Sequence, residues 1–536
     1  MRPLSDNGIP SVTWWATLAL LSAALFAPLL IADVPPILDY PNHLARFTLL
    51  AAGPDDPVLG PLFRPHWAII PNLASDVVGP MLLRILPIHV AGRSMLAGIL
   101  LLNLVGVLAL HRALFGRVFY WPLASGLVAY NSNFMLGFLN GQIGIGLAMI
   151  FAAAWITWRE EKPAATVVAA MMASVVLFFC HLIGVVFFLA LICSSEIYAV
   201  RYYRSMGRAL WALLPVLAAP VLLSFLTTLR DAPAALHWMT PQEKLIQLAS
   251  PFINYSFPLD MITAALLYGG VVLGVALGWL AVAPRAVAAV AALAVLYPFL
   301  PFDLMSASFV DTRVAVMLGF LLFAATEPAA LPRRIRSIFA AGLIGLFAAR
   351  MTMVADVWLE HRRDLADLRS VMASVPAGAL VYVTNVPQEE APAYWDAAPR
   401  SRRLSNTLRA DFHLPALLLI ERKAFWPILF ANPAQQPISL RAPYDRLARA
   451  AHDIPSHATL VADPDRGSAA LDLFDFVLML EAGADHNPDG FVPKCVALLS
   501  RTDFAALYRV RHEKGACVAD QSNHNSRGRA LYSIVG

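Results

Sequence analysis

The sequence places long apolar segments between short polar turns over its first two thirds. The first apolar run, 14–31, has about 18 residues, which is enough for one helix to cross a bilayer. Further apolar runs occupy 94–110, 118–130, 138–158, 164–180, 184–199, 210–227, 259–282, 286–302, 310–327 and 337–354. This pattern predicts a polytopic α-helical membrane protein with about eleven transmembrane helices. The first run lacks an A-x-A cleavage pattern, so we interpret it as an uncleaved anchor.

Beyond residue 355 the pattern changes to short apolar runs separated by polar loops. We expect helices at 365–373, 414–423 and 444–451, and strands at 379–384, 474–480 and 504–510. The chain then divides into a transmembrane domain, 1–355, and a soluble α/β domain, 356–536. The second part has about 180 residues, enough for a core of its own.

The stretch 32–91 is too polar to be membrane-embedded as a whole. Within it, the apolar segment 77–90 is interrupted by Pro80, Arg84 and Pro87. Such a segment fits the membrane interface better than the bilayer core. We therefore expect an outer loop that contains interfacial helices.

Charge sets the predicted orientation. Only 14% of the residues are charged, 59% are hydrophobic, and the net charge is +4. Arginines concentrate in the short turns between the apolar runs, which the positive-inside rule places in the cytoplasm together with the N-terminus. An odd number of spans then puts 32–91, 228–258 and the C-terminal domain outside, which is the periplasm if the protein spans a bacterial inner membrane. The positive excess is explained by topology, and no basic patch interleaved with aromatics suggests a nucleic-acid partner.

The segment 35–46 carries the strongest candidate chemistry. If a helix begins at Pro41, a residue suited to a first helical turn, Asn42 and Arg46 share one face and His43 lies one turn beyond Asp39. These four polar groups then point into one small volume, where His43 and Arg46 are candidates to bind substrate. A carboxylate at the mouth of a membrane helix is costly to bury, so it usually meets water, substrate or a metal. Asp39 is therefore the catalytic candidate. The alternative is that Asp39 only caps the helix and Arg46 sits among lipid headgroups.

Further polar side chains are expected in the same outer layer. The turn 131–142 is rich in amides, and Asn131 and Asn140 are candidates to bind a sugar or a phosphate. The equally weighted alternative is that the asparagines cap helix ends while Gly141, Gly144 and Gly146 allow close helix packing. His181 follows an apolar run on that side. It is a candidate ligand, or a structural hydrogen-bonding residue.

Cations in the outer loops are candidate phosphate ligands. Arg230, His237 and Lys244 lie in the loop 228–258, and Arg313 follows the turn into a later apolar run. Positive groups with nearby aromatics at this level suit a lipid-linked phosphate. The alternative is that these residues anchor the protein among lipid headgroups, which would give the same sequence pattern.

Cysteines and standard motifs narrow the function classes. Cys180 and Cys193 lie in apolar runs and are expected to be inert, whereas Cys495 and Cys517 form a disulfide if the C-terminal domain is extracytoplasmic. Two cysteines are too few for a zinc site. The sequence has no Walker loop, dinucleotide glycine fingerprint, G-x-S-x-G elbow or H-E-x-x-H motif, so nucleotide-driven transport and zinc proteolysis lack support.

This layout resembles the GT-C superfamily of integral-membrane glycosyltransferases. The resemblance rests on an anchor helix, an outer loop with Asp39 near its start, an aromatic and amide-rich turn at 130–140, many further spans and a C-terminal outer domain. It implies an inverting transfer of sugar from a polyprenyl-phosphate donor to an extracytoplasmic lipid, glycan or protein. The family's acid often has a second carboxylate or a His-Pro beside it, whereas Tyr40 follows Asp39 here. A divalent metal therefore stays open, with its second carboxylate drawn from Asp33, Asp55, Asp56, Asp76 or a later loop.

In this interpretation Asp39 removes the acceptor hydroxyl's proton, a role that contributes typically about 10²–10⁴ in rate. The outer cations stabilise the leaving phosphate. The alternatives are a transporter or flippase for a lipid-linked glycan, which predicts charges or helix breaks within the spans, and an assembly scaffold. Intramembrane charges are scarce in this sequence, which favours the transferase.

Overall fold

The computed structural model describes residues 11–227, 235–305, 307–329, 332–385, 399–405, 408–450, 471, 473–481 and 496–511. The chain separates into two compact units, and each is described by itself. Unit 1 consists of Met1–Arg363, Ala398–Ala416 and Leu429–Leu440, and unit 2 of Asp364–Ala397, Leu417–Ile428 and Arg441–Gly536. Unit 1 thus takes in three stretches that lie beyond residue 355, namely 356–363, 398–416 and 429–440.

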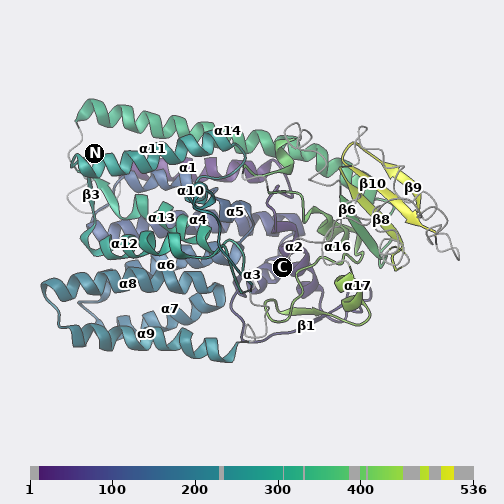
Figure 1. The fold of residues 1–536 in the computed structure, drawn as a ribbon, viewed down its shortest axis with the longest axis horizontal. Coiled ribbons are helices and arrows are strands. Elements are labelled where there is room, and N and C mark those ends of the chain that lie inside the picture. The colour runs from purple at the N-terminus through teal and green to yellow at the C-terminus, as the bar shows by residue number, and fades with distance from the viewer. Residues whose placement is uncertain are drawn as a thin grey trace, which may run out of the picture. The chain divides into compact units, whose positions relative to one another are not determined.

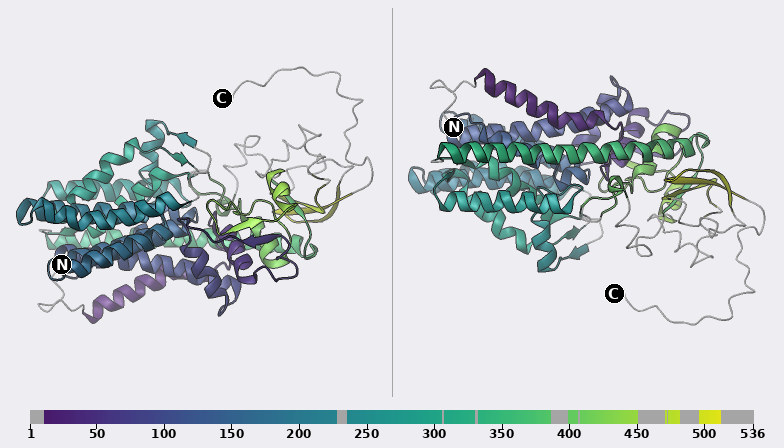
Figure 2. Two further views of the ribbon diagram at one scale, coloured as in Figure 1. Left: turned by 90° about the horizontal axis from the view of Figure 1, so that it is seen from below. Right: turned by 90° about the horizontal axis from the view of Figure 1, so that it is seen from above.

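Within the described residues, eight helices are long and apolar enough to span a membrane. They are α1 (Val12–Phe26, extended by the 3-10 helix η1, Ala27–Leu30), α4 (Ile88–Phe115), α6 (Leu139–Trp158), α7 (Pro163–Cys180), α8 (Leu182–Tyr202), α9 (Met206–Leu226), α11 (Phe257–Ala276) and α14 (Arg333–Met372). Figure 1 shows these helices, and Figure 2 shows that α14 is one continuous helix. The predicted polytopic helical architecture is confirmed.

Three of the predicted spans form shorter elements. The run 118–130 forms the 3-10 helix η2 (Trp121–Val128), the run 286–302 contains α12 (Val287–Leu296) between the 3-10 turns η4 (Pro284–Ala286) and η5 (Tyr297–Phe299), and the run 310–327 contains α13 (Val310–Ala324). A helix of 15 residues is about 22 Å long, short of the ~30 Å hydrocarbon core. Most of α13 is buried within unit 1, so its apolar sequence reflects protein packing.

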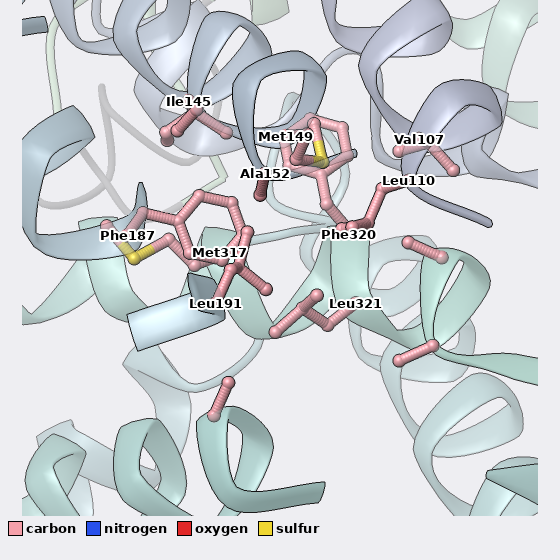
Figure 3. Packing of buried hydrophobic residues seen from close by; sticks show 14 of the residues in the cluster. Val107, Leu110, Ile145, Met149, Ala152, Phe187, Leu191, Met317, Phe320 and Leu321 are labelled. Carbon is pink, nitrogen blue, oxygen red and sulfur yellow. The ribbon is translucent and has the colours of Figure 1, made fainter. Parts of the chain in front are cut away.

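The core of unit 1 forms where α4, α6, α8 and α13 meet. Helix α4 packs against α6, and α6 packs against α8. Figure 3 shows side chains from all four helices in contact in this core, including Leu110, Met149, Phe187 and Phe320. Helices α6, α8 and α13 also carry residues of the candidate site at their starts.

Small residues bring α6 and α8 close together. A Cβ atom added at Gly184 would lie 2.9 Å from the Cα atom of Gly144, which is closer than packed atoms come. Glycine therefore permits the close backbone approach, as small residues do at membrane helix interfaces. This bears out the packing interpretation for Gly144.

Shorter elements complete unit 1. The helices are α2 (Tyr40–Ala52), α3 (Ala74–Leu83), α5 (Ser132–Met135) and α10 (Pro241–Gln247), and the paired strands are β1 with β7 (Phe63–Pro65, Ile438–Leu440), β2 with β4 (Ala235–His237, Asp303–Met305) and β3 with β5 (Leu280–Val282, Thr326–Pro328). All three pairs are antiparallel. The first pair joins a C-terminal segment to the loop that follows α2.

Unit 2 has the α/β character that the sequence predicts. Its sheet has the order β6, β8, β10, β9, with β6 parallel to β8 and the other pairs antiparallel. The strands are β6 (Val381–Asn385), β8 (Phe476–Leu480), β9 (Val496–Arg501) and β10 (Ala505–Val510), and the helices α16 (Leu417–Arg422) and α17 (Tyr444–Ala450) accompany them. Sequence analysis missed β9, an edge strand that is mostly exposed. The predicted disulfide between Cys495 and Cys517 lies outside the described residues.

Candidate active site

A cavity of about 450 Å³ in unit 1 collects the starts of four helices. Its walls include Asp39 before α2, Asn140 in the first turn of α6, Leu182 at the start of α8 and Phe309 before α13. The first turn of a helix carries unpaired N–H groups and a partial positive charge. Four such ends around one cavity make it favourable for an anion.

Asp39 is held at the edge of this cavity by its backbone. Its N–H group donates to the Leu136 carbonyl over 3.1 Å. Gly137, with φ at +82°, presses against it so closely that a Cβ atom there would lie 2.9 Å from the Asp39 nitrogen. Glycine is therefore required at 137 both for its conformation and for space. Asp39 stands at the N-cap position of α2, but its side chain makes no capping hydrogen bond, which removes the capping interpretation.

His413 is the histidine partner of Asp39. Its Nδ1 atom lies 2.9 Å from Asp39 Oδ1, and both residues are buried. The Phe430 ring contacts the His413 ring edge-to-face, with centroids 4.9 Å apart. Asp39 lines the cavity and His413 does not, so the imidazole lies behind the carboxylate. Sequence reasoning missed His413, because one histidine in the predicted soluble domain carries no local signal.

Arg46 is fixed by a buried ion pair that sequence analysis did not anticipate. Its Nε atom donates to Asp76 over 2.5 Å, and its Nη2 atom donates to the other Asp76 oxygen over 3.2 Å. Both side chains are almost completely buried, which excludes a headgroup position for Arg46. The Nη1 atom of Arg46 is buried and has no hydrogen-bond partner among the described residues. This leaves donor capacity at the cavity wall.

His43 connects Arg46 to the rest of the site. Its Nδ1 atom lies 2.8 Å from Arg46 Nη2. A guanidinium only donates, so His43 Nδ1 accepts and the proton of the neutral ring is on Nε2. Burial lowers the pKa of His43 well below its usual range, and Arg46 and His413 lower it further, against a hydrogen bond with the Gly137 backbone. His43 is therefore neutral at pH 7.

Arg313 forms the second cationic wall. It lies over the Phe138 ring, 4.8 Å from the centroid, and its Nη2 atom donates to the Ser308 carbonyl over 3.1 Å. Its Nε atom is buried without a partner among the described residues. The opposite charges of Asp39 and Arg313 also interact. Arg313 is thus a cation with unused donor capacity at the cavity.

His181 meets Arg313 donor to donor. His181 Nδ1 accepts from the Ile183 N–H group over 3.1 Å, so the ring proton is on Nε2, and that atom lies 3.2 Å from Arg313 Nη1. Burial, and then the charge of Arg313, lower the pKa of His181 to about 3. The N–H groups of His181 Nε2 and Arg313 Nη1 are therefore close together, and such a pair of donors can bind one anionic oxygen.

The two predicted amides have structural partners. Asn140 lines the cavity, but its Oδ1 atom accepts from Ser75 N–H over 2.6 Å and its Nδ2 atom donates to the Asn72 carbonyl over 2.8 Å. Asn131 does not line it; its Oδ1 atom caps α5 by accepting from Phe134 N–H. For Asn131 the structure places the side chain in the capping role that the sequence left as an alternative.

The loop cations lie elsewhere among the described residues. Lys244 is buried and donates to Asp311 over 2.6 Å, and His237 is exposed on β2, 3.6 Å from Asp303. Neither lines the cavity. Their expected place beside Asp39 is therefore corrected: a buried lysine needs a carboxylate, and Asp311 supplies it. Arg230 lies outside the described residues.

A metal site is not evident in the described part of the chain. It contains no group of three or more His, Cys, Asp or Glu side chains positioned to hold an ion. Of the predicted second carboxylates, Asp76 is paired with Arg46, and Asp33, Asp55 and Asp56 do not line the cavity.

Comparison with solved structures shows a likeness in fold over most of the chain. The chain is similar to the crystal structure of ArnT from Cupriavidus metallidurans bound to undecaprenyl phosphate, with 11% identity, 93% of this chain and 98% of that chain covered, and a TM-score of 0.55. The apo structure of ArnT gives a TM-score of 0.51 with the same coverage and identity. No family model matches the sequence, and no curated protein matches it. The resemblance inferred from the sequence is confirmed at the level of the fold.

Proposed function

We propose that this protein transfers a sugar from a polyprenyl-phosphate-linked donor to an extracytoplasmic acceptor, with Asp39 as the general base. One observation carries the proposal: a carboxylate, two arginines with unused buried donors and four helix starts share one cavity of about 450 Å³. Sugar transfer requires a base to accept the proton of the acceptor hydroxyl and, next to it, an anion site to bind the phosphate of the sugar donor.

The donor phosphate is assigned to the wall formed by Arg46, Arg313 and His181. The fold supports a lipid carrier, since ArnT, which has a similar fold, binds undecaprenyl phosphate in its crystal structure. A phosphodiester carries one negative charge. Arg313 supplies one positive charge without a carboxylate hydrogen-bonded to it, whereas Arg46 is neutralised by Asp76. Arg46 then contributes directed N–H groups more than net charge.

The proposed reaction is a single displacement. The acceptor hydroxyl attacks the anomeric carbon, its proton passes to Asp39, and the bond from that carbon to the phosphate oxygen breaks. The configuration at the carbon inverts, and the leaving polyprenyl phosphate gains a second negative charge. Arg46 and Arg313 are positioned to stabilise that added charge, which develops as the transition state forms. A resident metal is not assigned.

The cavity suits the head of a lipid that emerges from the bilayer. We therefore keep the proposed topology, in which the shorter elements η2, α12 and α13 still carry the chain across between the eight longer spans, so that the number of crossings stays odd. It places the N-terminus in the cytoplasm, the cavity and residues 356–536 on the periplasmic side, and the protein in a bacterial inner membrane. The acceptor is a lipid, glycan or protein of the cell envelope.

The test compares envelope lipids and glycans by mass spectrometry in cells that lack the gene, express the wild type or express a variant. The wild type is expected to add a product heavier by one sugar residue, and Asp39→Asn to lower its formation about 10²–10⁴-fold with unchanged protein level. Asp55→Asn, an exposed carboxylate away from the cavity, is the matched control. A glycan that changes compartment without changing mass would instead support transport, and activity retained by Asp39→Asn would overturn the assigned base.

A further inference from the structure

A second cavity, of about 440 Å³, lies between α1 and α14, with η2 as its floor. Its lining is almost entirely apolar, from Leu20 and Leu21 on α1 to Phe339 and Leu343 on α14. The groove is closed near Gly126 of η2. A Cβ atom there would lie 2.8 Å from Leu21 and 3.2 Å from Phe347, so the two helices close over that point.

The surroundings of this groove are lipid. Both of its walls are helices long and apolar enough to span the membrane, whereas η2 is a 3-10 helix of eight residues. Figure 2 shows α1 at the edge of the helical part of unit 1, and Figure 1 shows α14 at its edge. An apolar cavity that opens between two membrane helices is filled most favourably by hydrocarbon, since burial of each CH₂ group contributes about 0.8 kcal/mol.

One end of the groove carries an unusual positive charge. Arg336 lines the cavity from the first turn of α14, where exposed Arg334 also lies. The positive end of a helix disfavours cations, and this turn contains no acidic residue. Glu327, next to cavity-lining Pro328, is already paired with Arg117 at 2.5 Å. The helix start and Arg336 together are therefore complementary to an anion.

We infer that this groove binds one anionic phospholipid. An acyl chain lies in the apolar cavity along Phe339, Leu343 and Phe347, and the phosphate lies at Arg336 and the start of α14. Basic pockets between membrane helices bind anionic headgroups in this way, and each arginine contributes about 1 kcal/mol. The site lies on the side of α1 where that helix begins and shares no lining residue with the cavity of Asp39.

The experiment uses the full chain, delipidated in mild detergent and titrated with phosphatidylglycerol or phosphatidylcholine, with retained lipid counted by native mass spectrometry. The wild type is expected to retain one phosphatidylglycerol in preference to phosphatidylcholine. Arg336→Gln is expected to lower that preference about five-fold, and exposed Arg112→Gln, outside the groove, to leave it unchanged.

A second pair of variants tests the acyl site independently of charge. Ala340→Trp fills the groove and is expected to abolish tight retention of one lipid, whereas Ala341→Trp, on the adjacent exposed surface, retains it. Melting temperatures in phosphatidylcholine nanodiscs establish that all variants are folded. The inference would be overturned if both tryptophan variants retained the lipid equally, or if the two arginine variants had equal effects. Recovery of a polyprenyl phosphate in place of phosphatidylglycerol would also overturn it.

Discussion

The Nδ1 atom of His413 lies 2.9 Å from the Oδ1 atom of Asp39, although the two residues are far apart in the sequence. The histidine is buried behind the carboxylate and does not line the cavity. It therefore serves as a positioning residue for the proposed base. The close contact of the imidazole restricts one carboxylate oxygen, although Nδ1 is not aligned for a hydrogen bond with it.

The first prediction concerns that contact. His413→Leu removes the polar ring that contacts Asp39 and is expected to lower kcat about 10²-fold while KM for the sugar donor changes little, because a misplaced base affects chemistry more than binding. His413→Asn keeps an amide donor near the position of Nδ1 and is expected to recover most of the rate. Steady-state kinetics of the three proteins in nanodiscs measure this. Equal losses in the leucine and asparagine variants would indicate a merely structural histidine.

The second prediction separates stability from catalysis at Arg46. Arg46→Met leaves Asp76 buried without its partner, which is expected to cost about 3–5 kcal/mol in the free energy of unfolding. The double variant Arg46→Met, Asp76→Leu removes both charges and is expected to regain most of the melting temperature. Sugar transfer should stay low in the double variant, because the unused Nη1 donor is missing. If transfer returned with stability, Arg46 would be structural only.

The proposed base and its neighbours were predictable because they are local. Pro41 favours the first turn of a helix, so Asp39, His43 and Arg46 were expected on adjacent turns, and α2, which begins at Tyr40, places them there. His413 is brought in by tertiary structure, through the segment that carries Phe430, and no periodicity in a single sequence encodes such a contact.

Hydropathy also failed to separate lipid-facing from protein-facing helices. Helix α13 is as apolar as a membrane span, but it is buried by protein on nearly all sides and has 15 residues. Charge placement failed in a similar way at Lys244. Its sequence position suggested a phosphate ligand, whereas Asp311, a distant residue, neutralises it. The local sequence identifies charged side chains that could bind a ligand, but not the distant residues that pair with them.

The third prediction tests Arg313 as the phosphate ligand. Arg313→Leu removes charge-assisted hydrogen bonds worth about 1.5–3 kcal/mol, so the Kd for undecaprenyl phosphate is expected to rise about 10-fold to 100-fold. Arg313→Lys keeps the charge but loses the planar guanidinium, so its Kd is expected to lie between those of the wild type and Arg313→Leu. Arg84→Gln, an exposed arginine away from the cavity, is the control in the same binding titration. Unchanged binding by Arg313→Leu would exclude this residue from the anion site.

The fourth prediction is a pH dependence that originates at His181. Its pKa is lowered to about 3 by burial and by Arg313, whereas an unfolded histidine titrates near 6.5. Below about pH 6.5 this histidine therefore binds a proton in the unfolded chain but not in the folded protein. The contribution of His181 to stability is complete above that pH and decreases as the pH falls towards 3. At pH 5 this residue alone is expected to cost about 2 kcal/mol. Melting temperatures in nanodiscs at pH 7.5 and pH 5 should fall more for the wild type than for His181→Asn, which retains a side-chain oxygen to accept from Ile183 but does not titrate. If the melting temperature falls equally in both proteins, the acid sensitivity originates in other groups. His43, which is also buried and neutral, would then be the next residue to substitute.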